Sequence, residues 1–171
     1  MIDRQYPIGR VLLQADYTTD EMNEMIEKIV ATSVKYRGCV ENLSEEALAK
    51  TYREGSWDIR QIVHHVADIA LLHFFRMKKE ITEPGSEMAV IHMDEWAKTV
   101  DAQQYPVDDS LLMLASISNR YASLIRSLTE DQLQQSYFHP VRQIRITQKQ
   151  AVAMSAWHLE HHLAHIKLAL Q

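Results

Sequence analysis

Trp157-His158-Leu159-Glu160-His161-His162-Leu163-Ala164-His165 is the stretch that decides the fold, and it lies in a long segment without proline or glycine. At about 100° per residue, its four histidines fall within a helical arc of roughly 100°. Ala153, Glu160 and Lys167 are predicted to form a solvent-facing stripe on the opposite side of the same helix. The imidazoles therefore point into the protein, where buried polar rings need partners. This arrangement favours a metal site on a core helix.

A second pair of histidines, His64 and His65, lies in Val63-His64-His65-Val66-Ala67-Asp68. Helical spacing places the two side chains on different faces. His65 falls on an apolar side and is predicted to be a metal ligand, whereas His64 falls on a polar stripe and is predicted to face solvent. The neighbours that define these faces are Ile62, Ile69 and Leu72 for His65, and Gln61, Asp68 and Lys79 for His64.

His158 and His162 are about one helical turn apart, so both of their Nε2 atoms can meet one ion. His161 and His165 have the same spacing, and spacing alone does not choose between the pairs. With His65, the first pair gives three neutral imidazoles and an open fourth position, which is typical of a catalytic zinc site. We therefore predict one divalent ion per chain, zinc first, with nickel or iron(II) as alternatives. His161 and His165 are then hydrogen-bond donors around the ligands, pocket residues or core residues.

The remaining histidines are not part of a cluster of histidines in the sequence. A single inward histidine is more often a satisfied core residue than a ligand, and only the clustered set reverses that expectation. His73 and His92 are predicted to be structural or exposed. His139, beside Pro140 in a loop, is a weaker pocket candidate.

Helical periodicity covers most of the chain, and four glycines and four prolines in the whole sequence argue against a turn-rich β protein. The predicted architecture is one all-α domain over residues 1–171, a four-helix bundle with long crossovers and a small β-hairpin over 137–146. Residues 1–18 are predicted to be extended over a hydrophobic surface. The long helices are expected from Thr18 or Thr19 to Gly38 or Leu43, from Asp58 to Ile81, from Asp108 to Leu128 and over 148–170, with short ones after Ser44 and around 94–98.

A weak internal repeat accompanies these helices. Asn42–Leu48 is echoed by Ser127–Leu133, and a tyrosine follows each. Two halves, each with a long helix, a short helix and a histidine-bearing helix, would make a pseudo-symmetric bundle. Similar helix-capping chemistry alone would also produce the echo.

Composition excludes several classes of partner. The formal charge of -5, with both signs interspersed, gives no basic footprint for nucleic acid. The single cysteine, Cys39, leaves no intrachain disulfide and fits a reducing compartment. The N-terminus has no signal-like apolar run, and no stretch approaches the roughly 20 apolar residues that span a bilayer. We expect a cytoplasmic protein with no membrane partner.

Several motifs together resemble the DinB/YfiT-like superfamily of metal-binding four-helix bundles. The strongest are Trp57–Asp68 and His158-x3-His162, and the resemblance extends over nearly the whole chain. Four further segments resemble the YfiT (BstA) subgroup, namely Tyr6–Gly9, Tyr52–Trp57, Tyr137–Pro140 and the run that begins at Trp157-His158. The metal triad of the family falls here on His65, His158 and His162, in agreement with the helical faces.

The resemblance implies a fold and a metal more firmly than a reaction. Members of the subgroup are described as metal-dependent hydrolases or as thiol S-transferases, and they are usually dimeric. The transferases add low-molecular-weight thiols such as bacillithiol to electrophiles. The superfamily also contains members without an assigned activity.

Our first functional hypothesis is a thiol S-transferase in which the metal lowers the pKa of a cosubstrate thiol. The partners would be a small thiol, an electrophile and a second copy of the chain. A carboxylated thiol would pair with one of four arginines that the sequence does not separate, namely Arg53, Arg60, Arg142 and Arg145.

Two alternatives remain open at this level. The first is a hydrolase that uses metal-activated water. Because Glu160 lies on the wrong side of its helix and no HExxH pattern is present, His161 or His165 would have to serve as its acid/base. The second alternative is a non-catalytic interaction protein in which the ion only joins two helices.

Overall fold

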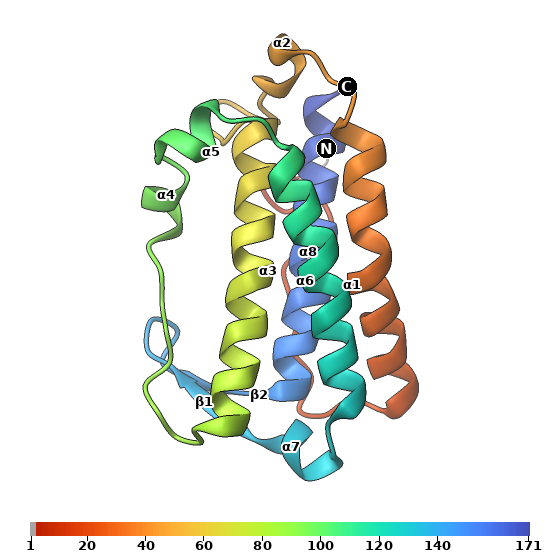
Figure 1. Ribbon diagram of the computed structural model, residues 1–171, viewed down its shortest axis with the longest axis vertical. Helices are drawn as coiled ribbons and strands as arrows, with labels where there is room; N and C mark the ends of the chain where they lie inside the picture. Colours follow the sequence, from red (N-terminus) through yellow and green to blue (C-terminus); the bar gives the residue numbers. More distant parts are fainter. Residues whose placement is uncertain (1–2) are drawn as a thin grey trace.

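Four long helices form the body of the protein (Figure 1). The computed structural model describes residues 3–171, so the first two residues of the predicted extended segment lie outside the described residues. α1 (Thr19–Val40) packs against α6 (Asp108–Ser127) and α8 (Gln148–Ala169). α3 (Ile59–Thr82) packs against the same two helices. This arrangement confirms the predicted four-helix bundle.

Short elements lie in the connections. Two short helices occur between α3 and α6, where the sequence predicted one around 94–98. The order long helix, short helix, long helix occurs twice, as the internal echo suggested, and an antiparallel hairpin precedes the last helix. The short elements are α2 (Glu45–Leu48), α4 (Met93–Trp96), α5 (Val100–Gln104), α7 (Glu130–Gln134), β1 (Ser136–His139) and β2 (Ile144–Thr147).

Three of the long helices begin at a capping box, in which two side chains satisfy backbone N–H groups of the first turn. The pairs are Thr18 with Glu21 for α1, Asp58 with Gln61 for α3, and Thr147 with Gln150 for α8. Gly38 does not interrupt α1, which continues to Val40. A glycine inside a helix costs only about 1 kcal/mol, which tertiary packing readily offsets.

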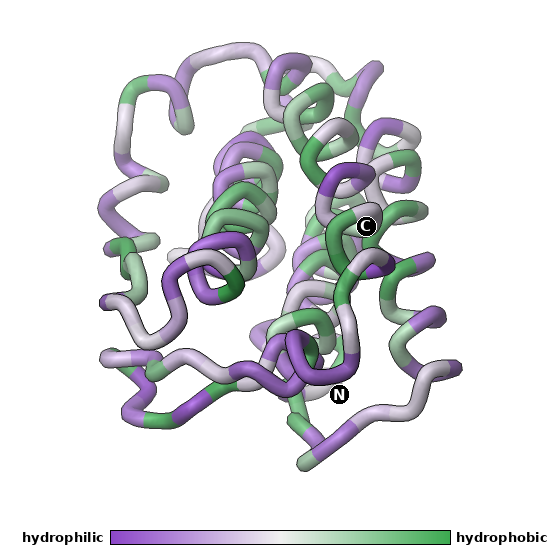
Figure 2. Tube along the Cα trace, turned by 60° about the horizontal axis from the view of Figure 1, so that its bottom comes forward, coloured by the Kyte–Doolittle hydropathy of each residue, from purple (hydrophilic) through white to green (hydrophobic). Residues whose placement is uncertain are grey.

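The long helices alternate hydrophobic and hydrophilic residues along their length (Figure 2). This pattern is that of amphipathic helices packed around a shared core. Within residues 3–171, no helix combines the length and the apolarity that crossing a membrane requires.

α8 departs from this pattern because it is covered on nearly every side. The predicted solvent-facing stripe is wrong at Ala153, which is buried, and at Glu160, which is half-buried; only Lys167 is exposed. The reason is that α8 packs against α1 and α3 and also against the hairpin and the N-terminal segment.

The N-terminal segment, residues 3–18, lies along α8. Leu13 packs against both hydrophobic clusters of the core. The indole Nε1 of Trp157 donates to the carbonyl of Gly9 at 3.2 Å. The ammonium group of Lys149 bonds to Asp16 at 2.9 Å and to the carbonyl of Tyr17 at 3.1 Å. These contacts hold the segment against the helix that carries four of the nine histidines.

Candidate metal centre

The three histidines predicted as ligands come together between α3 and α8. His65 projects from the second turn of α3, and His158 and His162 project from successive turns of α8. The Nε2 atoms of His65 and His158 are 3.1 Å apart. One ring nitrogen from each of the three residues lies within 4.8 Å of the other two.

This geometry fits a small divalent cation. Zn–N bonds of about 2.0–2.1 Å in a tetrahedron imply nitrogen–nitrogen separations of about 3.3 Å. The 3.1 Å between His65 and His158 is close to that separation, and the other ring nitrogens, all within 4.8 Å, would close by at most about 1.5 Å. The donors are imidazoles alone, which zinc, nickel and iron(II) all accept.

Burial keeps these donors neutral. It lowers the pKa of His65 to about 3, because a charged imidazolium is poorly solvated there. The pKa values of His158 and His162 are well below the ordinary range, first because of burial and then because of neighbouring imidazoles. All three rings are therefore unprotonated near pH 7, as metal ligands must be.

Aromatic rings surround the ligands. Trp57 packs against His65 with a centroid separation of 4.6 Å. His161 lies parallel to Trp157 at 4.4 Å, and His165 is stacked on Tyr52 at 3.8 Å. The four histidines of α8 thus share one side of the helix, as predicted, and divide into two candidate ligands and two outer residues.

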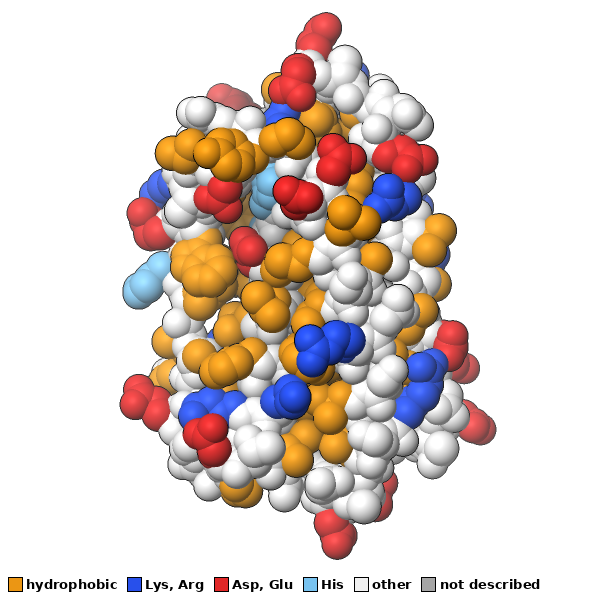
Figure 3. Space-filling view, viewed as in Figure 1, with side chains coloured by type: hydrophobic (Ala, Val, Ile, Leu, Met, Phe, Trp, Pro, Cys, Tyr) orange, Lys and Arg blue, Asp and Glu red, His pale blue; other side chains and the backbone are white. Residues whose placement is uncertain are grey.

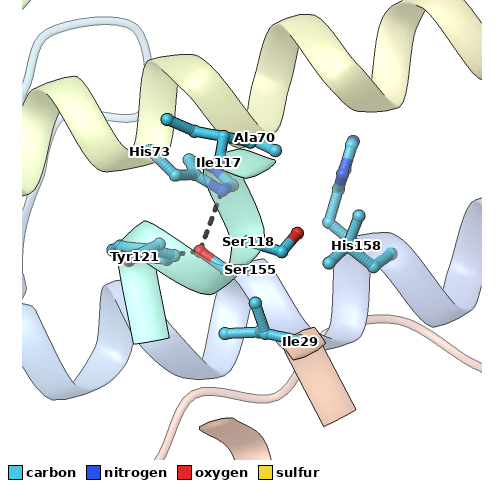
Figure 4. Close-up of a pocket in the computed structure, with 9 residues that line it drawn as sticks. Ile29, Ala70, His73, Ile117, Ser118, Tyr121, Ser155 and His158 are labelled. Atoms are coloured by element: carbon cyan, nitrogen blue, oxygen red, sulfur yellow. Dashed lines mark hydrogen bonds between the residues drawn. The ribbon is translucent and has the colours of Figure 1, made fainter. Parts of the chain in front are cut away.

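His73 lies closer to the site than the sequence suggested. It is buried, its ring is 6.0 Å from that of His158, and its Nδ1 is 2.8 Å from the hydroxyl of Ser155 (Figure 4). Its position eight residues after His65, on a neighbouring part of the same helical face, was the available signal. The expectation of a structural histidine holds, but the location beside a candidate ligand was missed.

A small cavity of about 10 Å³ adjoins His73 and His158. Its size corresponds to about one water molecule. The hydroxyl of Ser118, which lines it, is buried and has no hydrogen-bond partner among residues 3–171. The lining is otherwise largely apolar and consists of Ile29, Ala70, His73, Ile117, Ser118, Tyr121, Ser155, His158 and Leu159 (Figure 4).

His64 does not face solvent, contrary to the prediction. It is buried, with Nδ1 2.8 Å from the hydroxyl of Ser110 and Nε2 3.3 Å from the carbonyl of Tyr105. The crossover from α3 to α6 covers this polar side of α3, which helical periodicity alone does not reveal. His64 is still separate from the candidate ligands, as expected. His92 is exposed, which is one of its two predicted states. His139 is buried and is the last residue of β1, not a loop residue as predicted.

The structure separates the four candidate arginines. Arg60 is buried, paired with Glu45 and bonded to a backbone carbonyl. Arg145 is bonded to Ser136, and Arg53 lies over the ring of Tyr52. Arg142 is exposed at the hairpin turn, where its charge adds to the effect of burial in lowering the pKa of His158. Among the described residues it has no acidic partner within 4.0 Å.

With imidazoles converging between two of its helices, the protein is a four-helix bundle with a candidate metal site. The chain belongs to the DinB superfamily, whose family model matches residues 29–166. Within that superfamily it is YfiT-like. It is 28% identical over 165 residues to YfiT of Bacillus subtilis, covering 96% of this chain and 93% of the relative.

Other relatives are more similar in sequence. A protein of Oceanobacillus iheyensis is 41% identical over 170 residues, covering 99% of this chain and 96% of the relative. A protein of Halalkalibacterium halodurans is 37% identical over 170 residues, covering 99% and 98%. Their names, like that of YfiT, assign them provisionally to the metal-dependent hydrolases.

The solved structure of Bacillus subtilis YfiT matches the whole fold. The TM-score is 0.94 at 28% sequence identity, covering 97% of this chain and 95% of that chain. That protein is described as a probable metal-dependent hydrolase with an unusual four-helix bundle topology. Both the predicted fold class and the predicted family are confirmed.

Proposed function

We propose that this protein is a metal-dependent enzyme that transfers a low-molecular-weight thiol to an electrophile. His65, His158 and His162 would hold one divalent ion, zinc first and nickel or iron(II) as alternatives. A divalent ion there lowers the pKa of a thiol that binds to it. The observation that supports the proposal is the composition of the candidate ligand group. Within residues 3–171 this group consists of three histidines and includes no Asp or Glu.

The make-up of the site favours a thiol over water as the nucleophile. A free thiol has a pKa of about 8.5 and needs little help to ionise near neutral pH, whereas bulk water has a pKa of about 15.7. Hydrolysis also needs a group that returns a proton to the leaving group. Three of the rings that contact the candidate ligands are the imidazoles of His73, His161 and His165. Burial lowers the pKa of His73 to about 3 and that of His161 to about 4, so these two rings hold almost no proton to return near pH 7.

The sulfur would come from a cosubstrate. Cys39, the single cysteine, lies on α1 and is absent from the candidate ligand group of α3 and α8. In the transfer, the thiol loses its proton to solvent, a sulfur–carbon bond forms, and the electrophile's leaving group departs with its bonding electrons. The rings around the ligands would exclude water while this occurs.

The test is a product assay on protein loaded separately with zinc, nickel or iron(II). The loaded protein is mixed with a small thiol and an alkyl or aryl halide, and products are identified by mass spectrometry. We expect a thioether that disappears when the metal is removed by a chelator. No thioether with any of the three metals would contradict the proposal.

Hydrolysis is the second candidate, and the names of the relatives favour it. His161 or His165 would then supply the acid/base. The same loaded samples, given ester and amide substrates without thiol, separate this case by their products. If neither reaction occurs and metal-free protein melts far below the loaded form, the ion is a structural link in an interaction protein.

Arg142 is the arginine we propose for a carboxylate of the thiol. We expect Arg142→Gln to raise KM for a carboxylated thiol about tenfold, since one charge-assisted hydrogen bond contributes about 1.5–3 kcal/mol. The kcat should change little, and a thiol lacking the carboxylate should be unaffected. Arg145→Gln, in the same hairpin, is the matched control. Equal effects of the two substitutions on KM would contradict this role.

We also propose that the protein forms a homodimer and acts in the cytoplasm. Large apolar side chains lie exposed on several elements, including Leu71 and Phe75 on α3 and Trp96 on α4. Orange apolar patches are visible across the face shown in Figure 3. Exposed apolar area of this kind marks interaction surfaces. The single cysteine supports a reducing compartment.

A further inference from the structure

Both ring nitrogens of His165 have partners. Its Nε2 lies 3.2 Å from the backbone carbonyl oxygen of Gln5. Its Nδ1 lies 3.4 Å from the Nδ1 of His162, one of the three candidate metal ligands. The three groups therefore form a short chain of hydrogen bonds that ends on a ligand.

The carbonyl oxygen of Gln5, at the end of this series of hydrogen bonds, determines which ring nitrogens carry protons. A carbonyl oxygen can only accept, so Nε2 of a neutral His165 must carry its proton and donate it to Gln5. Nδ1 of His165 is then an acceptor, and Nδ1 of His162 must be the donor to it. This leaves Nε2 as the nitrogen of His162 that carries a lone pair.

The position of His165 is held from two sides. Its ring is stacked on Tyr52 with an interplanar angle of 8°. Arg4 donates from Nε to the carbonyl of Tyr52 at 2.6 Å and from a terminal nitrogen to the carbonyl of Leu168 at 3.1 Å. Arg4 thereby ties the backbone next to Gln5 both to the residue under the imidazole and to the end of α8.

We propose that His165 is a positioning residue, which fixes His162 in the tautomer protonated on Nδ1 so that its Nε2 is available to the metal. The fixed end of the chain is the carbonyl of Gln5, so the N-terminal segment belongs to the outer layer of the metal centre. The proposal rests on the proposed metal centre and is independent of the reaction catalysed there.

His161 provides the internal contrast. It occupies the same side of α8 and is equally surrounded by aromatic rings, Tyr6 and Trp157. Its Nδ1, however, is buried without a hydrogen-bond partner among the described residues. A general effect of removing an imidazole from this layer would therefore show in both histidines, whereas a positioning effect belongs to His165 alone.

The direct test reads the tautomers by long-range proton–nitrogen NMR on the metal-free, unsubstituted protein. We expect His162 protonated on Nδ1 and His165 protonated on Nε2. Finding His162 protonated on Nε2, or His165 on Nδ1, would overturn the proposal. The expected tautomers in a protein that binds no ion would support the hydrogen-bond chain and refute the proposed metal centre instead.

Substitutions test the consequence for zinc affinity, measured by chelator competition. His165→Phe keeps the stack on Tyr52 and removes both nitrogens, and we expect the Kd for zinc to rise about 10- to 100-fold, as for other groups that orient metal ligands. His165→Asn keeps an acceptor near the Nδ1 position and should recover part of this loss. His161→Phe is the control and should change the Kd less than about threefold. Equal losses in His165→Phe and His161→Phe would overturn the proposal, and the tautomer measurement decides if a variant fails to fold.

Discussion

Replacing His65 by alanine is expected to raise the Kd for zinc by more than about 100-fold, while alanine at the adjacent His64 leaves zinc binding nearly unchanged. Groups that merely orient ligands cost about 10- to 100-fold, so a lost ligand should exceed that range. The two residues form a matched pair, because they are neighbours on α3 and each is only 6% exposed.

For the stability of the metal-free protein, we expect His64→Ala to have a larger effect than His65→Ala. His64→Ala removes the partner of the Ser110 hydroxyl and one of two donors to the Tyr105 carbonyl, which also accepts from Arg60. This should lower the free energy of unfolding by about 2 kcal/mol. His65→Ala removes a ring whose nearest polar partner is another candidate ligand, His158. Zinc titration and urea unfolding on the two variants separate the roles. Tight zinc binding by His65→Ala would refute the assigned site.

Acid should destabilise the metal-free protein steeply. Burial lowers the pKa of His65 and of His73 to about 3, and that of His161 to about 4. In the unfolded chain these imidazoles titrate near 6.5. Below that pH the unfolded state binds more protons than the folded state, so the free energy of unfolding falls as pH falls. Each such group contributes about 1.4 kcal/mol per pH unit until its folded pKa is reached.

One carboxyl group acts in the opposite direction. Burial, with a further effect of Asp101, raises the pKa of Asp68 to about 6 from 3.8. Between those values the folded state holds the extra proton, so Asp68 adds stability as pH falls and offsets part of the histidine effect. Because buried histidines outnumber this one acid, the net slope should still be a loss of stability towards low pH.

Urea unfolding of metal-free protein between pH 7 and 4.5 measures this slope. His73→Leu removes one titrating group that is not itself a candidate ligand and should reduce the slope by about 1.4 kcal/mol per pH unit. Added zinc should move the loss of stability to lower pH, since the ion binds only the unprotonated imidazoles. A flat profile over this range would contradict the assigned burial of the histidines.

Local sequence properties predicted His65 but left two pairs open on α8, and only the family resemblance favoured His158 and His162 over His161 and His165. His158 and His162 are related by one helical turn, and His65 lies on an apolar face of a helix whose start is marked by Asp58 and Gln61. Helix starts were predictable for the same reason, because a capping box involves residues three positions apart.

Properties that depend on distant segments were not predictable. Ala153 is buried because it lies in the main hydrophobic cluster, to which distant segments such as Tyr17 and α1 contribute. His64 is buried because the crossover lies over its face of α3. His165 differs from His161 in its hydrogen bond to the carbonyl of Gln5, which lies 160 positions before His165 in the sequence.

These sequence separations also set the order of events during synthesis. His158 follows His65 by 93 positions. At ribosomal rates of about 5–20 residues per second, that interval is roughly 5–20 s. In a nascent chain, His65 is therefore present for seconds before His158 and His162 are synthesised. The interval between the synthesis of Gln5 and that of His165 is longer still. An ion held by all three histidines could accordingly bind only after α8 has left the ribosome.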